Sequence, residues 1–227
     1  MAQQTSLDET GRNLVSAAVA AAEESSAGEI VTILAERSDS YEDIALAWSA
    51  LVAFTALLVL ALAPDFYLGL YDRLTGSWGQ PWHPRQIFEL AATVAMLKFG
   101  GMWLLQQWAP LRFWLIPRAV KHARVRARAI TCFKVGAERR THGRTGILIY
   151  LSMREHRAEI VADEAIALKV SPEVWGDAMA AMLVHIRAGR VAEGMAAAVE
   201  KVGAVLAEHF PRDGADTNEL PDRLIEV

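Results

Sequence analysis

The feature that most constrains this chain is a run of twenty uncharged residues, Ile44–Ala63. A helix of that length extends about 30 Å, which is the thickness of the hydrocarbon core of a bilayer. A soluble helix of the same length normally has a polar face, whereas this run offers only Ser49 and Thr55. We therefore expect a membrane-spanning helix here, rather than a helix buried in a soluble core.

A second apolar stretch runs from about Ile87 to Trp108, with Glu89 near its start and Lys98 inside it. A lysine in mid-span costs about 2.5–3.5 kcal/mol on insertion scales, which the surrounding large apolar side chains can offset. Lys98 could be a buried functional charge, but we expect it to snorkel or to face the first span, since two helices are too few for a transport path. The residues between the two stretches are rich in glycine and proline, so we expect a loop and a helical hairpin.

The charged residues are distributed unevenly around these spans. Residues 1–43 carry two basic and nine acidic side chains, whereas residues 112–144 carry ten Lys or Arg and one acid. Basic residues favour the cytoplasmic side of a membrane, so we expect both flanking regions in the cytoplasm. The net charge of -4 does not favour binding to nucleic acid, which usually requires a basic protein. The N-terminus lacks the basic and apolar regions of a signal peptide.

The regions outside the two apolar stretches alternate between helical and strand patterns. A capping-box pattern at Ser6 and Glu9 predicts the first helix, and β-branched residues predict the strand that follows. Only four residues separate the last two predicted strands, which indicates an antiparallel hairpin, and the long connection before them allows the first two strands to be parallel. The expected elements are helices over 6–25, 117–136, 172–188 and 191–209, and strands over 29–35, 146–153 and 158–162.

This order of elements predicts an α/β fold, in which a small central mixed sheet is flanked by helices and interrupted by a two-helix transmembrane hairpin. The predicted boundaries are a first part of the α/β domain over 1–43, the hairpin over 44–116 with spans at about 44–63 and 87–108, a second part over 117–210, and a tail over 211–227. The single cysteine, Cys132, cannot form an intramolecular disulfide, which fits a reducing compartment.

The helix expected after the second span is strongly basic. Lys121, Arg124 and Arg128 fall on one face, and Ala123, Ala127 and Ile130 fall on the opposite face. Together with Arg118, the basic side chains could bind anionic headgroups, at about 1 kcal/mol for each residue near the surface. The alternative is that they serve only as the topology signal, and both interpretations can hold together.

These segments in their order resemble the TPM domain family, also called TPM_phosphatase, and its membrane-inserted bacterial subgroup. No single motif is diagnostic, but the resemblance spans nearly the whole chain. The stretches that carry it are Ala21–Glu23 with Gly28–Val31, Gly143–Tyr150, Ala158–Glu164, Arg187–Arg190 with Glu193 and Gly194, and Asn218–Leu224.

The resemblance implies an α/β fold with a central sheet, and a two-pass protein of the bacterial inner (plasma) membrane. Plant chloroplast members have been credited with acid phosphatase activity and a role in photosystem repair, whereas bacterial members of this type are mostly of unknown function. Many members carry the domain outside the cytoplasm on one terminal anchor, but here a hairpin interrupts it. Position 165 is Ala, where Gly is common in the family.

The acidic pair Asp163–Glu164 at the end of the third strand is the candidate catalytic site. Paired carboxylates could hold a divalent cation or act as general acid and base. Glu29 at the start of the first strand could approach the same edge and bind a metal ion with them. The alternative, which we favour, is a solvated turn that caps the next segment.

The segment Gly143–Gly146 is the candidate anion-binding loop. Its backbone N–H groups with Arg144 and Thr145 could cradle an anion, although the segment is not a Walker A loop. A tight entry into the second strand is the simpler interpretation. No zinc ligand spacing occurs among the six histidines, so we expect no structural zinc.

We therefore expect a membrane-anchored TPM-domain protein that acts on the cytoplasmic face as a partner-binding or membrane-protein maintenance module. Its expected partners are the lipid bilayer and another membrane protein, with no nucleic acid. The alternative is a metal-assisted, acid phosphatase-like hydrolase of phosphomonoesters that uses Asp163, Glu164 and Glu29. A transporter or channel subunit is a weaker third interpretation, because it would require oligomers.

Overall fold

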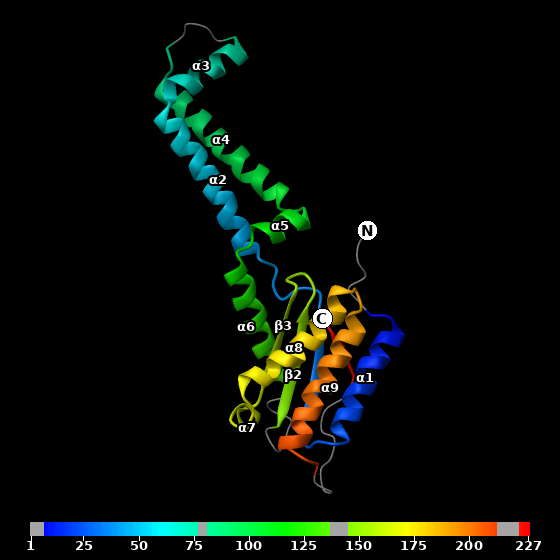
Figure 1. Ribbon diagram of the computed structural model, residues 1–227. Helices are drawn as coiled ribbons and strands as arrows, with labels where there is room; N and C mark the ends of the chain where they lie inside the picture. The colour runs from blue at the N-terminus through cyan, green and yellow to red at the C-terminus, as the bar shows by residue number, and fades with distance from the viewer. Residues whose placement is uncertain (1–6, 77–80, 137–144, 213–222) are drawn as a thin grey trace. The chain divides into compact units, whose positions relative to one another are not determined.

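The computed structural model describes residues 7–76, 81–136, 145–212 and 223–227 (Figure 1). The chain divides into two compact units. Residues 1–39 and 118–227 make up the first, here called the α/β unit, and residues 40–117 make up the second, here called the helical unit. The two units are described separately below.

The α/β unit is built on a four-stranded mixed sheet with the strand order β3-β2-β1-β4. The parallel strands β1 (Glu29–Ala35) and β2 (Gly146–Ser152) lie at its centre, and β3 (Arg157–Ala162) pairs antiparallel with β2. The predicted mixed sheet and the predicted antiparallel hairpin are confirmed. Both central strands are buried along their whole length, as expected for strands covered on two faces.

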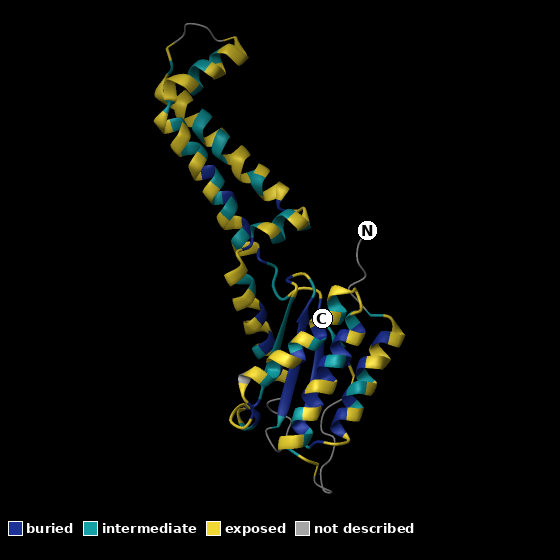
Figure 2. Cartoon of the chain, in the orientation of Figure 1, coloured by how far each residue is buried: buried dark blue, intermediate teal, exposed yellow. Residues whose placement is uncertain are grey.

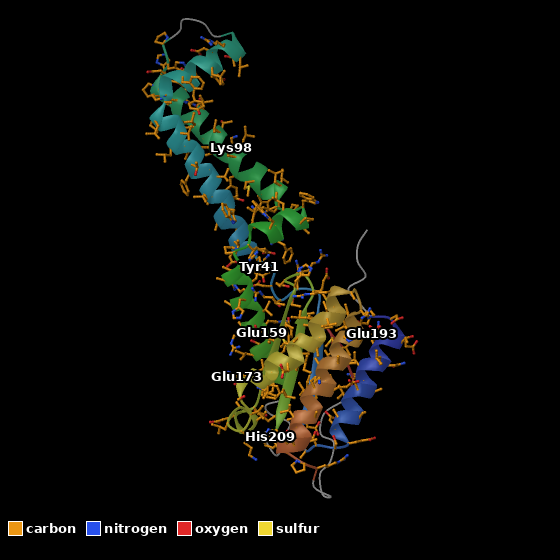
Figure 3. The ribbon with its side chains drawn as sticks, viewed as in Figure 1. Tyr41, Lys98, Glu159, Glu173, Glu193 and His209 are labelled. Atoms are coloured by element: carbon orange, nitrogen blue, oxygen red, sulfur yellow. The ribbon has the colours of Figure 1, made fainter. Side chains whose placement is uncertain are left out.

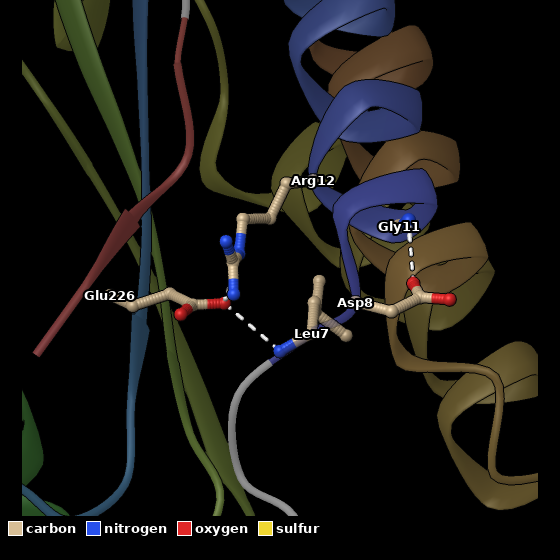
Figure 4. A network of polar contacts seen from close by, with 5 residues as sticks. All are labelled: Leu7, Asp8, Gly11, Arg12 and Glu226. Carbon is tan, nitrogen blue, oxygen red and sulfur yellow. Dashed lines mark hydrogen bonds and ion pairs between the residues drawn. The ribbon is translucent and has the colours of Figure 1, made fainter.

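The fourth strand, β4 (Ile225–Glu226), was missed, because the last residues were expected to be a tail. It pairs parallel with β1, and its short length gives no periodic pattern to detect. The Glu226 carboxylate accepts hydrogen bonds from Leu7 N at 2.9 Å and Arg12 Nε at 3.3 Å (Figure 4). The two ends of the described chain are thereby joined beside β1.

Helices cover both faces of this sheet (Figure 1). Helices α1 (Glu9–Glu23), α8 (Pro172–Arg187) and α9 (Val191–His209) pack on one face through a core that includes Ile147, Met182 and Val199. Helix α6 (Arg118–Gly136) packs on the other face, and the four-residue helix α7 (Glu164–Ala167) follows β3. This arrangement buries the alternate side chains of β1 and β2 on opposite sides of the sheet.

Two details of these helices differ from the sequence predictions. Helix α1 is capped by Asp8, whose carboxylate accepts a hydrogen bond from Gly11 N at 2.8 Å, so the helix begins later than expected (Figure 4). In α6 the buried side chains are Val125, Ala129 and Phe133, whereas Ala123 and Ala127 are exposed. The predicted apolar face was therefore wrong, because alanines fit either a buried or an exposed helical position.

The helical unit contains four helices in its described residues: α2 (Glu42–Leu62), α3 (Pro64–Thr75), α4 (Pro84–Leu105) and α5 (Ala109–Leu115). Helix α3 replaces part of the predicted loop, because its aromatic and leucine residues support a helix despite the flanking glycine and proline. Helices α2 and α4 pack against each other. Both helices are long and apolar enough to cross a membrane. In the most apolar 18-residue stretch of each helix, 17% of the residues of α2 are buried and none of the residues of α4 is buried. Figure 2 shows both helices as mainly exposed or intermediate.

Helix α2 and the end of α4 are joined by a buried polar contact. The Gln106 side chain donates hydrogen bonds to Ala45 O at 3.0 Å and to Ser49 Oγ at 3.2 Å. Lys98 lies on the exposed surface of α4 (Figure 3), which contradicts a buried charge facing the first span and leaves snorkelling as the alternative. The helical unit thus has a polar contact at one end and a largely exposed apolar surface.

Candidate functional site

The predicted acidic residues lie at the edge of the sheet where β1 and β2 begin and β3 ends. Glu29 is paired with Gly146 in the register of β1 and β2. On the other side of Gly146, Asp163 N donates to Gly146 O at 2.9 Å, and the Asp163 carboxylate accepts from Gly146 N at 3.0 Å. Two strand spacings of about 4.8 Å therefore separate the backbones of Glu29 and Asp163.

The members of the predicted catalytic pair have different surroundings. Asp163 is buried and its carboxylate is turned to the start of β2, whereas Glu164 is exposed in the first turn of α7. Asp163 occupies the N-cap position of α7, where its backbone carbonyl accepts a hydrogen bond from Ala167 N at 2.9 Å but its side chain makes no capping hydrogen bond. Its carboxylate therefore stabilises a strand end rather than the turn that we favoured from the sequence.

Another buried acid, Glu23, lies at the end of α1 and was not predicted. Its carboxylate accepts a hydrogen bond from Ile30 N at 2.7 Å. The sequence gives no signal for this contact, because it depends on how α1 returns onto β1. Among the residues that the structure describes, no three His, Cys, Asp or Glu side chains form a group that could hold a metal ion.

The predicted anion-binding loop is described only at its end. Thr145 donates from its hydroxyl to Ala27 O at 2.9 Å, and its own carbonyl accepts from Glu29 N at 3.1 Å. Both contacts tie the entry of β2 to the entry of β1. Arg144 lies outside the described residues, so its predicted role stays a prediction.

The opposite edge of the sheet, where β1 and β2 end, carries a polar cluster that the sequence did not indicate. It consists of Ser38, Tyr150, Ser152 and Glu155. The Ser38 hydroxyl shares a hydrogen bond with Tyr150 Oη at 3.1 Å and donates to Ser152 Oγ at 3.1 Å. Glu155 accepts a short hydrogen bond from Ser152 Oγ and a bond of 2.9 Å from Ser38 N. This edge of a parallel sheet is where ligands of α/β proteins commonly bind.

The chemistry available to this polar cluster is limited by its burial. Tyr150 and Ser152 have no exposed surface, and Glu155 is almost fully buried. Burial is also the main reason why the pKa of Tyr150 is raised above its ordinary value. A substrate cannot reach Ser152 as a nucleophile in this arrangement, so the cluster fixes the loops after β1 and β2. Sequence reasoning missed Glu155 because it lies in a turn whose geometry includes the left-handed backbone of His156.

Helix α6 places one of its basic residues next to this cluster. Lys121 is half-buried, at the end of the stripe formed by Val125 and Ala129. Desolvation lowers the pKa of Lys121, and the nearby Glu155 carboxylate partly opposes that shift. Lys121 therefore belongs partly to the packed face of α6 and not only to its basic surface.

The other predicted membrane-surface residues lie on the exposed side of α6. Arg124 forms an ion pair with Asp39 at 3.1 Å, and Arg118 and Arg128 are exposed. Glu159 of β3, labelled in Figure 3, is contacted by two further α6 residues, Arg126 at 3.3 Å and His122 at 3.5 Å. Exposed ion pairs of this kind contribute about 0–1 kcal/mol, so the basic surface remains able to bind other anions.

The single cysteine, Cys132, lies on α6 and is partly buried. Burial raises the pKa of its thiol, while the charge of Arg128 acts in the opposite direction. Because the thiolate is the reactive form of cysteine, this thiol is a poor nucleophile at neutral pH.

Comparisons with known proteins found a solved structure with a similar fold and a family model that matches part of the chain. The structure is similar to the NMR structure of the BA42 protein from the psychrophilic bacterium Bizionia argentinensis, with a TM-score of 0.57, 16% identity and 100% of each chain covered. At that identity the likeness concerns the fold alone. No curated protein matches the sequence.

A family model described as TPM domain, TPM_phosphatase, matches residues 112–205. This range begins after α4 and includes α6, β2, β3 and most of α9. The match is shorter than the resemblance inferred from the sequence, since it leaves out the stretches around β1 and near the C-terminus. Residues 112–205 are therefore similar to the TPM domain, and the α/β fold agrees with that match.

Proposed function

We propose that this chain is a membrane-anchored TPM-domain protein whose α/β unit binds a protein partner at the cytoplasmic face of a bacterial inner membrane. The observation that carries the proposal is the surface of the helical unit. Large side chains such as Phe54 and Leu97 are 69% and 71% exposed on helices of 21 and 22 residues. Such a surface is unfavourable in water and favourable in a hydrocarbon core.

The charge distribution supports the orientation. The acids Glu42 and Asp43 lie in the first turn of α2, and the basic helix α6 follows the helical unit directly in the chain. Basic side chains near the end of a span favour the cytoplasmic side. Both flanking segments belong to one folded α/β unit, so both must lie on the same side of the membrane.

A binding or maintenance role is favoured over the hydrolase because of what the carboxylates do. Asp163 and Glu23 each accept a hydrogen bond from a strand N–H group, which accounts for their burial without a substrate. The buried hydroxyl of Ser152 lies at the opposite edge and is inaccessible. The hydrolase therefore remains the alternative that an activity assay must test.

Topology labelling tests the anchoring. The native Cys132 is a poor reporter because it is partly buried, so it is replaced by Ser. In that background we introduce Leu168→Cys in the α/β unit, at a site 81% exposed, or Leu74→Cys in α3, at a site 79% exposed. In spheroplasts, an impermeant maleimide should label the α3 variant at once and the α/β variant only after lysis.

Two labelling results would contradict the proposal. Labelling of the α/β variant in intact spheroplasts would reverse the orientation, and protection of both sites would mean that the helices do not cross.

In mild detergent, the tagged full chain should co-purify with a membrane protein. Hydrolysis of a generic phosphomonoester that needs a divalent cation, and that Asp163→Asn abolishes, would replace the binding role with the hydrolase.

A further inference from the structure

The helical unit contains a cavity of about 400 Å³ between α3, α4 and the residues that lead into α4. Its lining includes two aromatic rings, two carboxylates and two uncharged polar side chains: Tyr71, Trp82, Asp72, Glu89, Gln86 and Thr93. From this lining we infer that the cavity binds a ligand through a positively charged ammonium group. The site is here called the ammonium pocket.

The two rings form one corner of the pocket. The centroids of Tyr71 and Trp82 are 5.4 Å apart, with an angle of 66° between the ring planes. Aromatic faces attract ammonium groups within about 6 Å of the centroid, and tryptophan does so most strongly. Proteins commonly recognise small organic cations with groups of aromatic rings, and these two rings supply part of such a group.

The carboxylate of Asp72 strengthens this corner. It accepts a hydrogen bond from Trp82 Nε1 at 3.3 Å, so the acidic group is held directly beside the indole. Donation of the indole N–H to an anion increases the electron density of the ring, which makes its face more attractive to a cation. Asp72 can also pair directly with the ammonium group, because a carboxylate accepts several hydrogen bonds.

Glu89 supplies a second negative charge from α4. It forms an exposed ion pair with Arg85 at 2.8 Å, one turn earlier on the same helix. An exposed pair of this spacing contributes only about 0.3–0.5 kcal/mol, so an ammonium group can compete for the carboxylate. The described lining itself contains no lysine or arginine, so its charge is negative.

Other classes of ligand fit this lining less well. An anion would be repelled by Asp72 and Glu89, and an apolar ligand would desolvate both carboxylates without compensation. A calcium ion normally takes six to eight oxygen ligands, whereas the described residues form no group of three potential metal ligands. The aromatic rings would be of no use to a metal ion, but they suit an alkyl ammonium.

The ammonium group has two sources, a lipid headgroup or a soluble amine. If the helical unit spans the membrane, as proposed above, α3 and the start of α4 lie at the water interface, where tyrosine and tryptophan are enriched. The lipid source rests on that proposed function, whereas binding of a soluble amine does not. The experiment below therefore separates the two.

Titration of the full chain in detergent with choline and with ethanolamine, followed by calorimetry, tests the pocket. We expect saturable binding, weakened roughly 5- to 30-fold by Trp82→Leu and by Asp72→Asn. The matched controls are Trp103→Leu on α4 and Asp65→Asn on α3, both exposed outside the pocket, and should stay within about twofold of the parent. Circular dichroism verifies that each variant retains its helices.

Absence of saturable binding by both amines would overturn the inference, and so would equal weakening by the control variants. Displacement of the amine by inorganic phosphate, or stronger binding of calcium ions alone, would also overturn it. In nanodiscs, the headgroup of phosphatidylethanolamine can compete with free ethanolamine, whereas that of phosphatidylglycerol carries no ammonium group. Weaker ethanolamine binding in phosphatidylethanolamine nanodiscs than in phosphatidylglycerol nanodiscs therefore supports a lipid headgroup as the occupant. Equal binding in the two nanodiscs supports a soluble amine, and both of these results support the ammonium pocket.

Discussion

The α/β unit and the helical unit treat their large apolar side chains in opposite ways. In β2, Ile147, Leu148 and Ile149 have no exposed surface, whereas Phe54 of α2 and Leu97 of α4 are mostly exposed. Both units are formed by one continuous chain with a single overall composition. The mean hydropathy of +0.19 is therefore the average of one unit that buries its apolar residues and one that displays them.

This difference shows what holds each unit together. The α/β unit has three clusters of buried hydrophobic residues, from both faces and one end of its sheet. In α2, by contrast, the buried residues are the small or polar Ala45, Ser49 and Ala53. Packing stabilises the first unit, whereas the second depends on close helix contact and on an apolar environment around it.

The largest expected effect is truncation of one leucine in each unit. Leu148→Ala removes a fully buried side chain between the sheet and α6 and should lower the free energy of unfolding by about 2–5 kcal/mol. Leu97→Ala should change it by less than about 0.5 kcal/mol in detergent, because the side chain is already exposed. Urea unfolding of both variants measures the difference, and similar losses would contradict the contrast between the units.

A glycine-to-alanine pair should have effects of opposite sign in the two units. A Cβ at Gly203 of α9 would lie 2.5 Å from Ala22 Cβ, so α1 and α9 would have to separate, at a cost of about 1–3 kcal/mol. A Cβ at Gly100 of α4 meets no atom within 4 Å, so Gly100→Ala should stabilise its helix by about 0.5–1 kcal/mol. Thermal unfolding in detergent reports both. Destabilisation by Gly100→Ala would show that another molecule packs closely against α4.

Two adjacent acids repeat the contrast within the α/β unit. Asp163→Ala removes the acceptor of the Gly146 N–H and should cost about 1–2 kcal/mol, whereas the exposed Glu164→Ala should cost less than about 0.5 kcal/mol. Asp163→Asn retains an acceptor oxygen and should lie between them. Urea unfolding ranks the three variants, and equal effects at both positions would argue against a structural role for Asp163.

The sequence was informative where a pattern repeats locally. Twenty uncharged residues predicted α2, and the short connection between two β-branched runs predicted the antiparallel pair of β2 and β3. It failed where distant segments meet. The contact of Glu23 with Ile30 N and the bonds from Ser38 to Tyr150 depend on the return of the chain in three dimensions, which no local spacing records.

The candidate site shows the same limit. The sequence correctly placed Asp163 at a strand end, but it could not show that the carboxylate binds Gly146 N. It also assigned Lys121 to a uniformly basic face, because periodicity alone does not show which side of α6 meets the sheet. The lowered pKa of Lys121 arises from that packing, and it leads to the smallest of the expected effects.

The stability of the α/β unit should depend on pH in the alkaline range, partly because of Lys121 on its packed helix α6. The pKa of Lys121 is lowered in the folded chain, mainly by desolvation, from its ordinary value of 10.5. At pH values between the lowered pKa of the folded chain and 10.5, Lys121 binds more protons in the unfolded chain than in the folded chain. Lys121 therefore makes the free energy of unfolding increase with pH over that range. Tyr150 and Cys132 act in the opposite direction, because their raised pKa values make the folded chain hold its protons longer.

Comparison with Lys121→Met isolates the lysine, since the variant retains Tyr150 and Cys132. The advantage of the parent over this variant should be greater at pH 10 than at pH 8, measured by urea unfolding at both pH values. Lys121→Arg is the matched control, because arginine keeps its charge throughout this range and should lack the increase. If the parent and both variants change in parallel between the two pH values, Lys121 is not desolvated by α6 packing, and its side chain belongs with the exposed basic surface.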